Sequence, residues 1–107
     1  MKLYPVSAAL CLAVALPMSA IASTTHEVGQ KDKKFTVAEL EVSAGDSVSF
    51  KNMDPFFHNV FSLSDAAFFD LGSYPEGQSK EVKFETAGTV EVECAIHPTM
   101  KMTIKVK

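Results

Sequence analysis

The stretch that decides the fold is Val90-Glu91-Val92-Glu93-Cys94-Ala95-Ile96-His97-Pro98-Thr99-Met100, near the C-terminus. Apolar and charged residues alternate strictly up to Cys94, which predicts a β-strand with one buried face. Because Val90 and Val92 share the parity of Cys94, the thiol should point into the interior at the end of that strand. Alternation resumes in Lys101–Val106. Two strands should therefore flank a short loop that carries a thiol, an imidazole and a thioether.

Further segments with a period of two residues precede this stretch, and turn signals separate them. The expected strands are Thr25–Gln30, Thr36–Val42, Ser47–Asn52, Asn59–Leu63, Ser79–Glu85, Val90–Cys94 and Lys101–Val106. Short strands at this spacing predict an all-β fold, a sandwich of two sheets with about seven to eight strands. Only Ser64–Leu71 is a candidate for a helical turn. No repeat, low-complexity tract or linker divides the chain, so we expect one domain.

The N-terminus has the features of a secretory signal peptide. Lys2 is followed by the apolar run Val6–Leu16, and Ala20-Ile21-Ala22 forms a cleavage signal of small residues. The pattern predicts a signal peptide over residues 1–22 and an exported, periplasmic domain over residues 23–107. The apolar run is shorter than the ~20 residues that span a bilayer, so the protein should not be membrane-spanning.

Cleavage would leave Cys94 as the sole cysteine, because Cys11 departs with the signal peptide. Lipidation of Cys11 is an alternative, but Leu10 stands where lipoprotein signals place a small residue. A single thiol in an oxidising compartment cannot form an internal disulfide, which favours a bound metal. The loss of Lys2 leaves nine basic residues against thirteen carboxylates, a net charge of −4. This acidic balance argues against nucleic acid and anionic lipid as partners.

Four side chains form the candidate metal site. His58 lies 36 positions before Cys94, where an aromatic loop enters a strand, and it supplies a second imidazole. Pro98 forces His97 into an extended conformation, which places it in a loop at the rim of the sandwich. Two imidazoles, a thiolate and a weak axial thioether are the donor set of a blue-copper electron-transfer site. The predicted ligands are His58, Cys94, His97 and Met100.

Each of these residue types also has an ordinary structural role. A buried cysteine is commonly a small core residue. Met102 competes with Met100 for the axial position, but it shares the parity of the apolar residues of the last strand and is expected in the core. His26 should be exposed or form part of a weak N-terminal metal site. Zinc is the alternative ion, although a thioether is a poor zinc ligand. The combination of these residues in one exported β-domain favours copper.

The predicted domain as a whole resembles the small cupredoxins, the type 1 copper proteins that include plastocyanin, amicyanin and pseudoazurin. The resemblance rests on Gly45-Asp46 before a strand, on the segment from Asn52 to Asn59, and on the loop Cys94-x-x-His97-x-x-Met100, whose short spacing is similar to that of amicyanin. The motif Phe69-Asp70-Leu71-Gly72-x-Tyr74 suggests a less studied bacterial plastocyanin-like branch. The resemblance implies a Greek-key β-sandwich with one type 1 copper per chain.

The resemblance also implies roles for residues beside the ligands, which are Asn59, Ile96 and Pro98. Asn59 is similar to the family residue whose polar groups tie the two ligand loops together and whose backbone N–H bonds the cysteine sulfur. Ile96 replaces a proline that amicyanin and plastocyanin carry before the loop histidine. Its N–H is therefore free to give Cys94 a second hydrogen bond, which should favour Cu(I) and raise the reduction potential.

The ligand set implies one-electron transfer, with a redox protein such as a cytochrome c, a dehydrogenase or an oxidase as partner. The acidic surface should steer a basic partner, the apolar residues Pro55, Phe56, Phe57 and Pro98 should form a small docking patch, and the protein should be a monomer. The alternative is a periplasmic copper carrier or buffer. Such proteins display exposed Met- and His-rich runs, which this chain lacks. An enzyme is not expected, because the four-donor site leaves no position for substrate.

Overall fold

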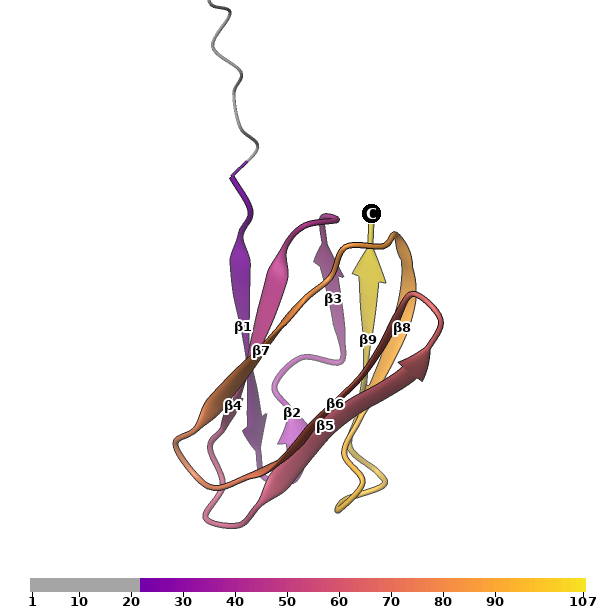
Figure 1. The fold of residues 1–107 in the computed structure, drawn as a ribbon. Coiled ribbons are helices and arrows are strands. Elements are labelled where there is room, and N and C mark those ends of the chain that lie inside the picture. The colour runs from indigo at the N-terminus through magenta and orange to yellow at the C-terminus, as the bar shows by residue number, and fades with distance from the viewer. Residues whose placement is uncertain (1–21) are drawn as a thin grey trace, which may run out of the picture.

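The computed structural model describes residues 22–107, and it contains nine β-strands. Residues 1–21 of the predicted signal peptide, with Cys11, lie outside the described residues. Four strands form one sheet in the order β2-β1-β4-β7, and five form the other in the order β3-β9-β8-β5-β6 (Figure 1). The bounds are β1 Thr25–Lys31, β2 Lys34–Phe35, β3 Glu39–Val42, β4 Ser47–Asn52, β5 His58–Ser64, β6 Ala67–Tyr74, β7 Ser79–Lys83, β8 Gly88–Glu93 and β9 Lys101–Val106.

The two sheets pack face to face as a β-sandwich, which confirms the predicted fold class. Strand β1 pairs in parallel with β4, and β3 pairs in parallel with β9, while the other neighbours are antiparallel. Figure 1 shows the β4–β5 and β8–β9 loops together at the lower end of the sandwich, and the C-terminus and the β3–β4 turn at the upper end. Segments far apart in the sequence therefore meet at the lower end.

The core follows from the alternation in the sequence. One face of each central strand is apolar, and the fully buried side chains include Val28, Val48, Phe50, Val90 and Ile104. Burial of such residues is worth about 1.5–3 kcal/mol each before conformational entropy is counted. Cys94 is 1% exposed, as its parity with Val90 and Val92 predicts.

The candidate helical turn over Ser64–Leu71 does not form. This segment forms the end of β5, a turn and the first part of β6, whose register places Leu63 opposite Phe68 and Phe61 opposite Asp70. Phe68 is 78% exposed, whereas Phe69 on the other face packs edge-on against Phe84 with ring centroids 6.0 Å apart. Pairing with β5 and burial of Phe69 thus override the local helical preference.

The segment expected as one strand over Thr36–Val42 is divided into the two-residue β2 and the four-residue β3. We expected seven to eight strands. This division and the additional strand β6 bring the number in residues 22–107 to nine. Among residues 22–107 there is no helix of the length and apolarity needed to cross a membrane.

Candidate metal centre

Three donor atoms predicted from the sequence lie together at the lower end of the sandwich. His58 is the first residue of β5, Cys94 directly follows β8, and His97 lies in the loop before β9. Sγ of Cys94 is 3.8 Å from Nδ1 of His58 and 3.9 Å from Nδ1 of His97, and the two Nδ1 atoms are 3.2 Å apart. All three atoms lie within 4.8 Å of one another. One ion could therefore contact all three.

The loop that carries Cys94, His97 and Met100 is closed on itself by backbone hydrogen bonds. Met100 N donates to His97 O at 2.8 Å, and Cys94 N donates to Met100 O at 3.3 Å. The Met100 side chain is buried just before β9 begins. Met102 is also buried, but it lies within β9 opposite Val92, as a core residue of that strand. Met100 is thus the methionine of the loop, and Met102 belongs to the core.

Asn59 connects the two segments that carry the donor atoms. Its backbone N–H points at Cys94 Sγ at 3.5 Å, and its Oδ1 accepts a hydrogen bond of 2.7 Å from Ala95 N. Within residues 22–107, no hydrogen bond links the Ile96 N–H to Cys94 Sγ. The second hydrogen bond to the thiolate, which we expected from the Ile96 N–H, is therefore absent from this part of the chain. The Ile96 side chain is instead 46% exposed at the surface.

A buried carboxylate that the sequence analysis missed lies behind His58. Nε2 of His58 is 2.7 Å from Oδ2 of Asp54, and both side chains are almost fully buried. The same carboxylate accepts hydrogen bonds from the backbone N–H groups of Asp32 and Lys33 at 2.8 and 3.1 Å. This contact leaves Nδ1 of His58 directed at the thiol, and it fixes the tautomer of the ring.

The two backbone donors to Asp54 come from the tight turn between β1 and β2. Asp32 and Lys33 have φ angles of 53° and 57°, the left-handed conformation typical of a two-residue type I′ hairpin. Consecutive N–H groups in such a turn form a small concave anion site. Burial alone would raise the pKa of Asp54, but the hydrogen bonds from His58, Lys33 and Asp32 together lower the pKa below its ordinary value. Asp54 is thus held as a carboxylate.

Asn52 holds the loop between β4 and β5 in shape. Its Nδ2 donates to the carbonyl oxygens of Phe56 and Tyr74 at 2.8 and 3.0 Å, and its Oδ1 accepts from Asp54 N at 2.8 Å. Because Asn52 is fully buried, these three contacts replace the hydration it has lost. They place Asp54 and Phe56 at fixed positions around His58.

Phe56 covers both imidazoles. Its ring centroid is 5.3 Å from that of His58 and 5.3 Å from that of His97. His97 is half-buried, whereas His58 is fully buried. Burial, followed by the nearby charges of His58 and Lys33, lowers the pKa of His97. A lowered pKa keeps the ring neutral at pH 7, which is the form that binds a metal.

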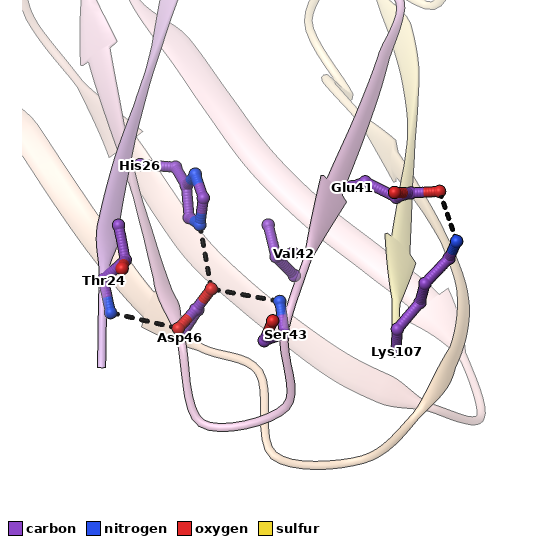
Figure 2. Close-up of a pocket in the computed structure, with 7 residues that line it drawn as sticks. All are labelled: Thr24, His26, Glu41, Val42, Ser43, Asp46 and Lys107. Carbon is purple, nitrogen blue, oxygen red and sulfur yellow. Dashed lines mark hydrogen bonds and ion pairs between the residues drawn. The ribbon is translucent and has the colours of Figure 1, made fainter. Parts of the chain in front are cut away.

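His26, the third histidine, lies at the opposite end of the sandwich. It lines a polar pocket of 290 Å³ with Thr24, Glu41, Val42, Ser43, Asp46 and Lys107 (Figure 2). Nε2 of His26 is 3.0 Å from Oδ2 of Asp46, and this carboxylate also accepts hydrogen bonds from Thr24 N and Ser43 N. The hydrogen bonds from His26, Thr24 and Ser43 lower the pKa of Asp46 to about 2. His26 is therefore a structural partner of Asp46, remote from the three donor atoms.

Sequence reasoning found the donor residues but not Asp54 or the ring contacts of Phe56. The signal for Asp54 was its position four residues before His58 in a segment already singled out. Which carboxylate reaches the ring, however, depends on the shape of the β4–β5 loop and on the turn after β1. Neither can be read from a periodic pattern.

The chemistry of the donor set fits copper. A sulfur donor from cysteine and two imidazoles, one of them oriented by a carboxylate, suit both Cu(I) and Cu(II). The thiol of Cys94, the one free cysteine among residues 22–107, is 1% exposed, and a thiolate buried in this way needs a cation beside it. Zinc would require a fourth strong donor, which a thioether does not supply.

Comparisons with known proteins agree with this chemistry. The family described as copper binding proteins, plastocyanin/azurin family, matches residues 22–107. The chain is 31% identical to the methylamine utilization protein MauL of Methylorubrum extorquens, over 99% of this chain and 92% of that protein.

Solved structures show the same fold. A reduced variant of amicyanin has a TM-score of 0.73 at 26% identity, covering 82% of this chain and 87% of that one. The copper-containing nitrite reductase of Thermus scotoductus also has a TM-score of 0.73, at 24% identity, but this chain spans only 22% of it. At that identity the second likeness concerns the fold alone. From its fold, its cluster of donor atoms and these matches, the chain belongs to the plastocyanin/azurin family of copper-binding proteins, the cupredoxins.

Proposed function

We propose that this protein carries single electrons between redox partners in the periplasm, through one type 1 copper held by His58, Cys94, His97 and Met100. The observation that carries the proposal is the convergence of Sγ of Cys94 with Nδ1 of His58 and Nδ1 of His97 within 4.8 Å. Copper in such a set supplies a reversible Cu(I)/Cu(II) couple. Met100 is the proposed fourth ligand, because its buried side chain lies at the end of the loop that hydrogen bonds close on itself.

The protein's own residues would hold bound copper in one geometry for both oxidation states. The Asp54 carboxylate orients His58, the Asn59 N–H approaches the Cys94 sulfur, and the hydrogen bond from Met100 N to His97 O keeps the loop short. A rigid, dry site needs little rearrangement when the charge changes by one, and the buried carboxylate offsets part of the added positive charge. Pro98 is exposed beside His97 and limits the conformations of that histidine.

His97 provides the exit for the electron, because it is the less buried of the two histidines. Apolar side chains are exposed in the two loops that carry the histidines: Phe56 is 37% exposed, Phe57 54% and Ile96 46%. These three residues form the apolar rim. A small apolar rim suits the brief, low-area contacts of redox proteins. The formal net charge of −3 for the full chain, which becomes −4 after the proposed cleavage, favours a basic partner.

The likeness to MauL supports methylamine utilization as one setting for this function, with a dehydrogenase as a candidate electron donor. A cytochrome c or an oxidase would be the acceptor. The proposal includes a monomer without catalytic activity, because four protein donors would leave the ion no open position for a substrate.

Absorption spectroscopy and redox titration of the copper-loaded protein test this proposal. We expect an intense thiolate-to-copper charge-transfer band in the oxidised protein that disappears on one-electron reduction and returns on reoxidation. Cys94→Ser should abolish the band, and His97→Ala should change it. His26→Ala is the matched control, because His26 lies at the other end of the sandwich and should leave the band unchanged.

The rival function, copper delivery, predicts a different result. A carrier must release its ion, so a colourless protein that surrenders copper quickly to a chelator would overturn the electron-transfer proposal. The burial of Cys94, His58 and Met100, each 1% exposed or less, favours slow exchange instead.

A further inference from the structure

We infer that Asp70, an exposed residue of β6 outside the ligand loops, is a positioning residue for the copper site, and that it acts through the side-chain amide of Asn59. The inference rests on the proposed function for its copper readouts. The juxtaposition behind it is a hydrogen bond of 3.1 Å from Asn59 Nδ2 to Asp70 Oδ1.

Every polar group of Asn59 is engaged, although the residue is only 6% exposed. The N–H points at Cys94 Sγ, the carbonyl oxygen accepts from Gln30 Nε2 at 3.4 Å, Oδ1 accepts from Ala95 N, and Nδ2 donates to Asp70. Because Ala95 N can only donate, Oδ1 must face it, and Nδ2 must then find an acceptor on the other side. Asp70 is that acceptor.

The position of Asp70 is itself fixed by an irregularity in β6. The register between β5 and β6 shifts between Asn59 and Phe61, so that Asn59 pairs with Ser73 while Phe61 pairs with Asp70. This shift leaves Leu71 and Gly72 opposite the single residue Val60, which is a β-bulge. Gly72 has a φ angle of +70°, a conformation that glycine adopts at little cost.

Hydrogen bonds lock this bulge on both sides. Gly72 N donates to Asp70 Oδ1 at 2.8 Å, so the same oxygen that receives Asn59 Nδ2 also caps the bulge. Lys80 Nζ donates to the Leu71 carbonyl at 2.7 Å. Bulges of this kind re-aim a side chain beside a functional site. Here the bulge turns a surface carboxylate toward Asn59, and Asn59 in turn contacts Cys94 Sγ and Ala95 N.

The consequence is that removal of the Asp70 acceptor should loosen the Asn59 amide and, through it, the contacts to Ala95 N and Cys94 Sγ. A partner that orients a ligand from outside the site typically changes metal affinity by about 10–100-fold when it is lost. The acceptor oxygen, rather than the charge, should carry the effect, because the contact is a hydrogen bond to a neutral amide.

Three variants separate the acceptor from the charge. Asp70→Ala removes both the acceptor and the charge, Asp70→Asn keeps an acceptor oxygen without the charge, and Asp65→Ala removes the charge of another exposed carboxylate in the nearby β5–β6 turn. We expect Asp70→Ala to shift the charge-transfer band and to speed copper loss to a chelator about tenfold or more. Asp70→Asn should stay within about twofold of the unaltered protein, and Asp65→Ala should not differ from it.

Nuclear magnetic resonance of the copper-free protein gives a second readout that does not depend on copper. The Asn59 Nδ2 protons should shift in Asp70→Asn, since a carboxylate acceptor is replaced by an amide, and should not shift in Asp65→Asn. Amide exchange at Ala95 N should be at least several-fold faster in Asp70→Ala.

Equal spectra and copper-loss rates for Asp70→Ala and Asp65→Ala would overturn the inference, as would an unshifted Asn59 Nδ2 signal in Asp70→Asn. Equal effects of Asp70→Ala and Asp70→Asn on the copper readouts would assign the effect to charge and would also overturn it. An unaltered protein without a charge-transfer band would instead count against the proposed function, while the resonance experiment would still decide the role of Asp70.

Discussion

Nε2 of His58 lies 2.7 Å from Oδ2 of Asp54, and the two side chains are 0% and 5% exposed. This contact joins two separate parts of the chain, because Asp54 is also held by the backbone of the turn between β1 and β2. The N-terminal hairpin, which contributes no metal ligand, therefore sets the orientation of the upstream histidine.

Asp54→Asn should weaken copper binding. An amide cannot accept from His58 Nε2 and from both backbone N–H groups as well as a carboxylate does, so the imidazole should lose its fixed orientation. We expect copper affinity to fall by about 10–100-fold, measured by competition with a chelator of known affinity. Asp65→Asn, which removes an exposed carboxylate with the same change of charge, should keep the original affinity. An affinity for Asp54→Asn that matches this control would contradict the prediction.

The two buried methionines should differ in their effect on the reduction potential. Met100→Leu should raise the potential and leave the protein coloured, because loss of a weak axial donor destabilises Cu(II) more than Cu(I). Met102→Leu keeps the volume of a core residue in β9 and should leave the potential unchanged, at a stability cost below about 1.5 kcal/mol. Spectroelectrochemical titration measures both. A shift confined to Met102→Leu would move the axial ligand to that residue.

The stability of the fold should depend on pH through Asp46 in the acidic range. The pKa of Asp46 is lowered from 3.8 to about 2 by hydrogen bonds from His26, Thr24 and Ser43. A lowered pKa in the folded state contributes stability above about pH 4, and this contribution is lost as the pH falls toward 2. Denaturant unfolding at several pH values should show the loss in the unaltered protein and a flatter profile in Asp46→Asn. Parallel profiles for the two proteins would count against the prediction.

Electron exchange should depend on the apolar rim beside His97. Phe57→Lys introduces a charge that must face its own copy when two molecules meet at this rim, so electron self-exchange should slow by at least about tenfold, equivalent to about 1.4 kcal/mol. Line broadening in mixtures of oxidised and reduced protein measures the rate. Phe68→Lys, on the outer face of β6, is the matched control and should have little effect. Similar slowing by both variants would indicate a general charge effect.

Much of the fold was predictable from local pattern. Alternation placed Cys94 in the interior with Val90 and Val92, since side chains two residues apart share a face of a strand. The same rule assigned Met102 to the core. It failed for Ser64–Leu71, where the edge strand β6 forms because β5 supplies hydrogen-bonding partners and Phe84 supplies a contact for Phe69. A short apolar segment without strict alternation does not reveal such a partner.

The sequence by itself determined that the chain is all-β, and it predicted which residues would bind copper, because residue chemistry and spacing are local properties. Only the tertiary structure decided what surrounds those residues. Asp54 is held beside His58 by a turn more than twenty residues away in the sequence. Asp70 is held beside Asn59 by a bulge in the neighbouring strand. Hydrogen bonds of this kind depend on where two distant segments meet and on local deviations from regular pairing. A period of two residues specifies the face of a strand but carries no information about either.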